Sequence, residues 1–224
     1  MEDTVTLEEY HPNGQLALRK TMRDEVPHGP LKQFDEQGNP VMTSHFKDGR
    51  LHGLTLNFGP RGQVVQDCTY EDGVLHGPVR LFDEEGRLQQ VMPYRGGVAH
   101  GEAVMYQKGK KQFTMDYRDG ELHGLVTEYD PVGRVRARLR FSGGRQEGLS
   151  SWFDVEGRLL RSSIYVSGML EGETLEYHLN GNLRARSHYR EDQLDGAVEE
   201  FDEHGNPTNR TVYELGRKIE APES

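Results

Sequence analysis

The amino-acid sequence predicts an all-β fold, a single-domain repeat array of about nine 24-residue β-hairpins in an elongated, twisted antiparallel meander. Three observations support this prediction: a glycine and two separate aromatic series each recur once per unit. A fixed period of this length is typical of repeat architectures, in which each unit is one supersecondary element. The glycines that close the units are Gly29, Gly53, Gly77, Gly101, Gly124, Gly148, Gly172 and Gly196. Every interval between them is 24 residues except the one that ends at Gly124, which is 23.

The two aromatic series keep the same register as the glycines. The first series is Tyr10, Phe34, Phe58, Phe82, Tyr106, Tyr129, Phe153, Tyr177 and Phe201. The second is Phe46, Tyr70, Tyr94, Tyr117, Phe141, Tyr165, Tyr189 and Tyr213, with Met22 in its first place. The chain is only 33% hydrophobic and its mean hydropathy is -0.82, a composition that disordered chains share. Disordered chains do not keep such a register, so we expect a thin sheet with one lightly buried face.

Each unit contains two turn signals, which leave room for two strands. The first signal, seen from Asp35 to Gly38, has Asp at its first position and Gly at its last. This pattern is typical of a type I turn whose final Gly adopts a left-handed bulge conformation. The second signal is Asp-Gly, as at Asp48-Gly49, the strongest short hairpin signal. The residue missing from the 23-residue unit falls in a turn, at residues 106–109.

The segments between the turns alternate as strands do. Leu88, Gln90, Met92 and Tyr94 point to one side and the residues between them to the other, which marks a strand with one covered face. No segment between glycines reaches the ten to twelve residues of a helix without a turn signal. Consecutive hairpins therefore predict a meander of about 18 strands. We place the repeat domain at residues 1–216 and a flexible tail at residues 217–224.

The closing motif of each unit resembles a known repeat. Gly-x-Leu-His-Gly, as at residues 49–53, 73–77 and 120–124, is similar to the core of MORN repeats. The 24-residue spacing and the Phe/Tyr-Asp-x-x-Gly half resemble the bacterial MORN-repeat variant class of YwqK-type antitoxin proteins. The resemblance covers nearly the whole chain, although Glu147, Glu171 and Asp195 replace the histidine in later units.

Composition excludes several functional classes. The net charge of -10 argues against nucleic-acid binding and against strong binding to anionic membranes, since both use clustered Lys and Arg. Cys68 is the only cysteine, so neither an intrachain disulfide nor a multi-thiolate metal site is expected. The start of the chain, Met1 to Thr4, has no signal-peptide pattern, and no apolar run is long enough for a membrane span. We therefore expect a cytoplasmic protein.

The residues that could support catalysis favour structural roles. His28, His52, His76, His100 and His123 form a column, but neighbours about 10 Å apart by strand spacing cannot share a metal ion. We interpret them as turn histidines that cap backbone groups. Acid pairs such as Glu84-Glu85 fit solvated turns, and Cys68 fits a small packing residue. With no catalytic motif either, we predict no enzyme activity, no cofactor and no metal.

A cluster of arginines and the single tryptophan are the candidate partner-binding residues. Four arginines alternate along one predicted strand, Arg134, Arg136, Arg138 and Arg140, so we expect their guanidinium groups to project from one face as a basic patch in an acidic protein. Solubilising surface charge is the alternative. Trp152 is expected to face away from Phe153, either as an exposed binding residue or packed under a neighbouring side chain. The candidates are Arg134, Arg136, Arg138, Arg140, Trp152, Arg184 and Arg186.

A curved sheet without a pocket suits the binding of another protein over a broad area, as in other repeat arrays. The resemblance implies a more specific role: an antitoxin or immunity protein that neutralises a cognate toxin or secreted effector by occlusion. The alternative is a structural scaffold or membrane-associated adaptor. The chain is expected to be a monomer, or a homo-oligomer that assembles through its open edge strands.

Overall fold

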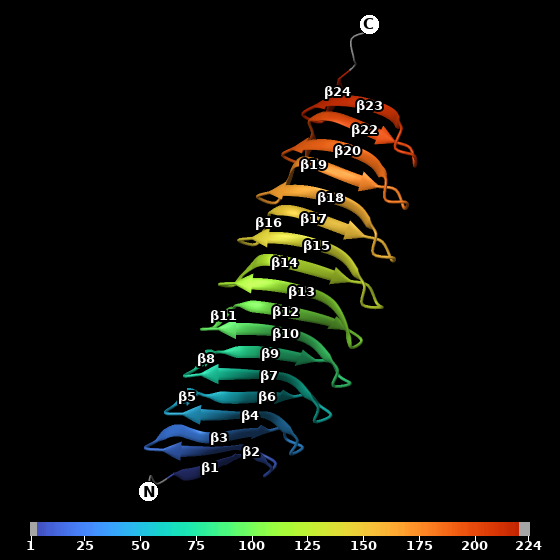
Figure 1. The fold of residues 1–224 in the computed structure, drawn as a ribbon. Helices are drawn as coiled ribbons and strands as arrows, with labels where there is room; N and C mark the ends of the chain where they lie inside the picture. The colour runs from blue at the N-terminus through green and yellow to red at the C-terminus, as the bar shows by residue number, and fades with distance from the viewer. Residues whose placement is uncertain (1–3, 220–224) are drawn as a thin grey trace. The chain divides into compact units, whose positions relative to one another are not determined.

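The computed structural model describes residues 4–219, and this part of the chain contains strands and turns but no helix. The strands fall into two compact units, residues 1–109 and 110–224. Within each unit, successive strands pair antiparallel, so each is a meander, as the all-β prediction required (Figure 1). The described residues offer no helical segment that could cross a membrane. The prediction of one domain over residues 1–216 stays a prediction.

The first unit holds twelve strands. Their bounds are β1 (Val5–Tyr10), β2 (Leu16–Arg23), β3 (Val26–Phe34), β4 (Pro40–Lys47), β5 (Arg50–Leu51), β6 (Gly53–Phe58), β7 (Val64–Glu71), β8 (Val74–Leu75), β9 (Gly77–Phe82), β10 (Leu88–Arg95), β11 (Val98–Ala99) and β12 (Gly101–Gln107).

The second unit also holds twelve strands. They are β13 (Lys110–Arg118), β14 (Glu121–Tyr129), β15 (Val135–Ser142), β16 (Arg145–Gln146), β17 (Gly148–Phe153), β18 (Leu159–Val166), β19 (Met169–Tyr177), β20 (Leu183–Arg190), β21 (Gln193–Leu194), β22 (Gly196–Phe201), β23 (Pro207–Glu214) and β24 (Arg217–Ile219). The strand count exceeds the predicted 18 because many return strands are interrupted at the closing motif. For example, β5 ends at Leu51 and β6 begins at Gly53, so the two are separated by a single residue, His52.

Both predicted turn types are confirmed. In the first turn, the Asp35 carboxylate accepts backbone hydrogen bonds from Gln37 (3.0 Å) and Asn39 (2.8 Å), while Gly38 has φ +85°. The pairing of β3 with β4 shifts register beside this turn, as the predicted bulge requires. In the second turn, Asp48 and Gly49 both have positive φ, +49° and +79°, which is the type I′ geometry that joins right-twisted strands.

The residue before the closing glycine caps the turn of the next hairpin. The Nδ1 atom of His28 accepts a hydrogen bond from the backbone N–H of Asp48 (3.3 Å), as the capping interpretation predicted. In the second unit, Glu147 accepts from the N–H of Ser167 (2.8 Å) in the same way. The change from His to Glu therefore keeps a hydrogen-bond acceptor at this place, which explains why the period survives the change.

The buried residues form a file of small side chains along each unit. In the first unit they include Thr55 and Cys68, which face each other across β6 and β7. In the second they include Ser150 and Ser163, both fully buried and paired across β17 and β18. Cys68 is 3% exposed and burial raises the pKa of its thiol, which fits the predicted packing role better than that of a nucleophile.

The repeat extends beyond the predicted boundary at residue 216. Leu215 and Gly216 form a further turn with positive φ, and β24 (Arg217–Ile219) pairs with β23. Residues 217–219 thus belong to the sheet, because this turn brings their backbone groups alongside β23. The rest of the predicted tail, residues 220–224, and the predicted leaderless start at residues 1–3 lie outside the described residues.

Candidate binding surface

Strand β15 presents two arginines on one face of the second unit, Arg138 and Arg140, that form no ion pair with any described residue. Its residues alternate, with Ala137 and Leu139 toward the covered face and Arg138 and Arg140 exposed on the other. Arg136 is also exposed, but it occupies a bulge: Ala137 pairs with Glu128 and Val135 pairs with Tyr129, which leaves Arg136 without a strand partner. We call the side of the second unit that carries Arg138 and Arg140 the arginine face.

The expectation that Arg134 shares this strand and face is wrong. Arg134 precedes β15 and lies in the first turn of its hairpin, where its Nε donates to Asp130 Oδ2 at 3.0 Å. Asp130 Oδ1 also accepts the backbone N–H groups of Arg134 and Val132, both at 2.9 Å. The backbone N–H of Arg134 is the main cause that lowers the pKa of Asp130, so the carboxylate holds the arginine in the turn.

The two candidate arginines of β20, Arg184 and Arg186, are neutralised within the sheet. Arg184 forms an ion pair with Glu176. Arg186 lies between two carboxylates, with Nε 3.1 Å from Glu173 and Nη1 3.6 Å from Glu199. These arginines differ from Arg138 and Arg140, for which no carboxylate in the described part of the chain lies within ion-pair distance.

Arg138 and Arg140 line a shallow hollow of about 480 Å³ on the arginine face. Across the strands, Arg140 pairs with Leu125 of β14, while Arg138 pairs with Thr127 of β14 and Ser151 of β17. Leu149 lines the hollow beside Arg140 and is 54% exposed, and Leu125 is 39% exposed. The floor thus has one apolar level around Arg140 and one hydroxyl-bearing level around Arg138, and its remaining lining residues are Tyr129 and Val135.

Aromatic rings hold two cations at this surface. The guanidinium carbon of Arg138 lies 5.6 Å from the centre of the Phe153 ring. Lys111 Nζ lies 5.7 Å from the centre of the Tyr129 ring, which also lines the hollow. Cation–π contacts of this length stabilise a cation in place while leaving its N–H groups free to donate. These two contacts therefore place cations over aromatic rings at the arginine face.

Trp152 lies on the opposite face from Arg138. It pairs with Ala137 on the covered side, is half-buried, and the guanidinium of Arg161 lies over its ring at 5.3 Å. Phe153 is on the arginine face, so the expected opposition of these two aromatics is observed. Of the two alternatives for Trp152, the structure favours packing under a neighbouring side chain. It does not bring Trp152 together with Arg138 and Arg140.

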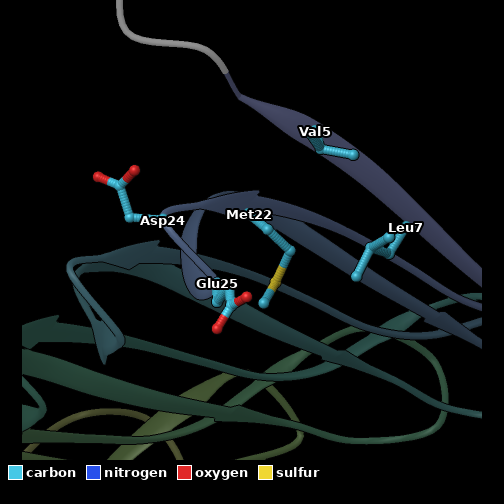
Figure 2. Close-up of a pocket in the computed structure, with 5 residues that line it drawn as sticks. All are labelled: Val5, Leu7, Met22, Asp24 and Glu25. Carbon is cyan, nitrogen blue, oxygen red and sulfur yellow. The ribbon is translucent and has the colours of Figure 1, made fainter.

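The first unit contains a hollow of different chemistry. It has a volume of about 340 Å³ and is lined by Val5, Leu7, Met22, Asp24 and Glu25. Figure 2 shows the apolar side chains of β1 and β2 on one side and the two acidic residues in the turn after β2. No basic side chain lines this hollow among the described residues, so it shares neither charge nor pattern with the arginine face.

Residues 4–219 contain no group of three metal-ligating side chains. Asp130 and Asp202 have a lowered pKa, in each case mainly through hydrogen bonds within their own turns. A general acid needs the opposite shift. These carboxylates serve the turns.

Sequence reasoning missed the apolar residues beside the arginines. Leu125 and Leu149 each follow a closing glycine directly, and this place in the repeat is exposed on the arginine face. The sequence contains a signal for this surface, namely the change from Leu125 to the acidic Glu173 at the equivalent position two 24-residue repeats later. The change from leucine to glutamate can be interpreted only when the strand register shows which arginine lies beside each residue.

Two segments of the chain match a known family model. Residues 27–48 and 170–191 are similar to the MORN repeat variant. Each matched segment runs from just before the closing glycine of one repeat to the second turn of the next, through β3 and β4 in the first case and β19 and β20 in the second. Most of the other hairpins have the same turns and period as these two segments; the 23-residue repeat differs, with a two-residue turn at Lys108 and Gly109.

No curated protein matches the chain. Among solved structures, the chain is similar to one of TcdB2-TccC3-Cdc42, with 15% identity and a TM-score of 0.20 over 93% of this chain and 12% of that one. It is similar to one of TcdB2-TccC3-TEV, with 13% identity and a TM-score of 0.24 over 97% of this chain and 15% of that one. The chain thus spans less than a sixth of the length of either protein.

Proposed function

We propose that this protein is a non-catalytic binding module that neutralises a cognate bacterial toxin or secreted effector by covering its functional surface. The observation that supports this most directly is the arginine face. Arg138 and Arg140 lie unpaired beside the exposed side chains of Leu125 and Leu149, in a chain whose net charge is -10. Exposed apolar residues next to organised charge are typical of protein-binding surfaces.

Occlusion needs only a rigid surface and no reacting group. Within the second unit, which carries the arginine face, successive hairpins are joined by strand pairing and by caps such as that from Glu147 to Ser167. A frame of this kind loses little conformational freedom when a partner binds, which favours affinity. The partner we propose is an acidic protein that meets the arginine face in the cytoplasm, with one copy of the chain bound to each toxin molecule.

The test is protection of cells. Products of genes adjacent to the gene for this chain are expressed singly, and those that arrest growth are expressed again together with it. We expect one of them to be neutralised and to copurify with the chain. Protection should be lost with Arg138→Glu/Arg140→Glu and kept with Arg184→Ala/Arg186→Ala, which removes arginines already paired. If no adjacent product is neutralised, the proposal is wrong.

A second candidate is a structural scaffold or membrane-associated adaptor, which the MORN-variant match favours. Sedimentation with phosphatidylserine vesicles at low salt separates the two roles. Binding that requires Arg138 and Arg140 would favour the adaptor, and its absence would favour the binding module. Light scattering on the same sample would show whether the chain is a monomer or assembles through its edge strands.

A further inference from the structure

The chain contains two equivalent arginine positions, one with carboxylates beside it and one without. Arg138 and Arg186 are two 24-residue repeats apart and occupy the same position in their strands, β15 and β20. Arg186 has a carboxylate on each side, from Glu173 and Glu199. The equivalent places around Arg138 hold Leu125 and Ser151 instead, and both of these residues line the hollow. The same backbone geometry thus holds a neutralised arginine in one 24-residue repeat and an arginine without an ion pair in another.

From this comparison we propose that the hollow on the arginine face binds an extended acidic segment of a partner protein, whose carboxylates take the place that Glu173 and Glu199 occupy around Arg186. The inference rests on the proposed function and names the chemistry of its partner. The cations that line the hollow are Arg138 and Arg140, and Lys111 lies over the ring of Tyr129, which also lines it.

The spacing of the arginines sets the spacing of the carboxylates. Arg138 and Arg140 are two residues apart on one strand, about 6.6 Å along its axis. Side chains on one face of an extended peptide have the same spacing, so acidic residues at every second position would reach both arginines. Thr127 and Ser151 can donate hydroxyl hydrogen bonds at the level of Arg138, and Leu125 and Leu149 can cover methylene groups at the level of Arg140.

The probe is a fluorescein-labelled octapeptide of alternating Glu and Val, measured by fluorescence anisotropy against the full chain. An exposed ion pair contributes about two- to fivefold to affinity, so Arg138→Ala/Arg140→Ala should weaken binding about tenfold. The matched control, Arg184→Ala/Arg186→Ala, removes the same charge from paired arginines and should change affinity less than about twofold. A Gln-Val peptide should bind at least about tenfold more weakly than the Glu-Val peptide.

A second variant tests the site without removing an arginine. Ser151→Glu places a carboxylate beside Arg138 as Glu199 lies beside Arg186, and it should also weaken peptide binding severalfold. Circular dichroism and thermal melting confirm that each variant is folded. The inference is overturned if the wild-type chain does not bind the Glu-Val peptide, if the Gln-Val peptide binds equally well, or if the control variant loses as much affinity as the test variant. Protection of cells by a chain that fails to bind the peptide would overturn this inference alone and leave the proposed function standing.

Discussion

Two threonines at equivalent places in the repeat should respond in opposite directions to the same substitution. Thr55 and Thr174 each lie two residues after a closing glycine, and they are 5% and 3% exposed. Thr174 Oγ1 donates a hydrogen bond to Ser163 Oγ at 3.0 Å. Thr55 Oγ1 is buried and has no hydrogen-bond partner in the described part of the chain. The substitution to Val keeps the shape and removes only the hydroxyl.

The magnitudes follow from the hydrogen bonds. An unpaired buried hydroxyl destabilises the folded state by about 1–3 kcal/mol, so Thr55→Val should stabilise the protein by about 1 kcal/mol or more. A satisfied hydrogen bond contributes about 0.5–1.5 kcal/mol, so Thr174→Val should destabilise it by about 1 kcal/mol. Ser163 keeps its bond from Arg161 Nε at 3.0 Å, which limits the second loss. The two variants should therefore differ by about 2 kcal/mol.

The assay is urea unfolding followed by far-ultraviolet circular dichroism, together with thermal melting of the same samples. For a chain of this length, about 1 kcal/mol corresponds to a melting-temperature change of about 2–4 °C. We expect the Thr55→Val midpoint to rise and the Thr174→Val midpoint to fall. A fall in both midpoints would refute the reasoning, since it would show that the Thr55 hydroxyl is satisfied in the folded protein.

Three further predictions concern a glycine, a turn carboxylate and the tryptophan. Gly124→Ala should destabilise the protein more than Gly86→Ala does, as measured by urea unfolding. Both glycines have positive φ (+103° and +76°), but only at Gly124 would the new Cβ meet another side chain, that of Asp116, at 3.0 Å. The pKa of Asp130 is lowered in the folded state, so its contribution to stability is present above its unfolded pKa of about 3.9 and is lost as pH falls through the lower folded value. Asp130→Asn should therefore flatten the decline of melting temperature below about pH 4. Removing the cation over the ring with Arg161→Ala should shift Trp152 emission to longer wavelength and increase its quenching by iodide, whereas unchanged emission would contradict the packing seen here.

The fold could be predicted from the sequence because its determinants are local. The type I′ turn at Asp48-Gly49 and the left-handed Gly38 each depend on a few consecutive residues, and both recur with the period. The residue missing from the 23-residue repeat falls in a turn, as the sequence predicts, and there Lys108 and Gly109 have φ +50° and +76°. Once such turns are fixed, the strands between them have little choice of partner.

The binding surface could be predicted only in part, because the state of an arginine depends on neighbours in other strands. Alternation alone placed Arg138 and Arg186 in one class, yet the partners that separate them lie 13 residues away along the chain, Ser151 for the first and Glu199 for the second. The prediction for Arg134 fails for a different reason. Its side chain is captured by Asp130 in the turn before the strand begins, so strand periodicity does not apply to it.

In a repeat protein, a place where the period fails in side-chain chemistry but holds in backbone geometry is informative about function. The pairings of Arg138 with Ser151 and of Arg186 with Glu199 have the same register, so the difference between them comes from the side chains alone. Neutralising Arg138 required only an acidic residue in place of Ser151, which the same frame accepts two units later. An unneutralised arginine is therefore no requirement of the fold, and a partner that supplies the carboxylate gives a physical reason for it.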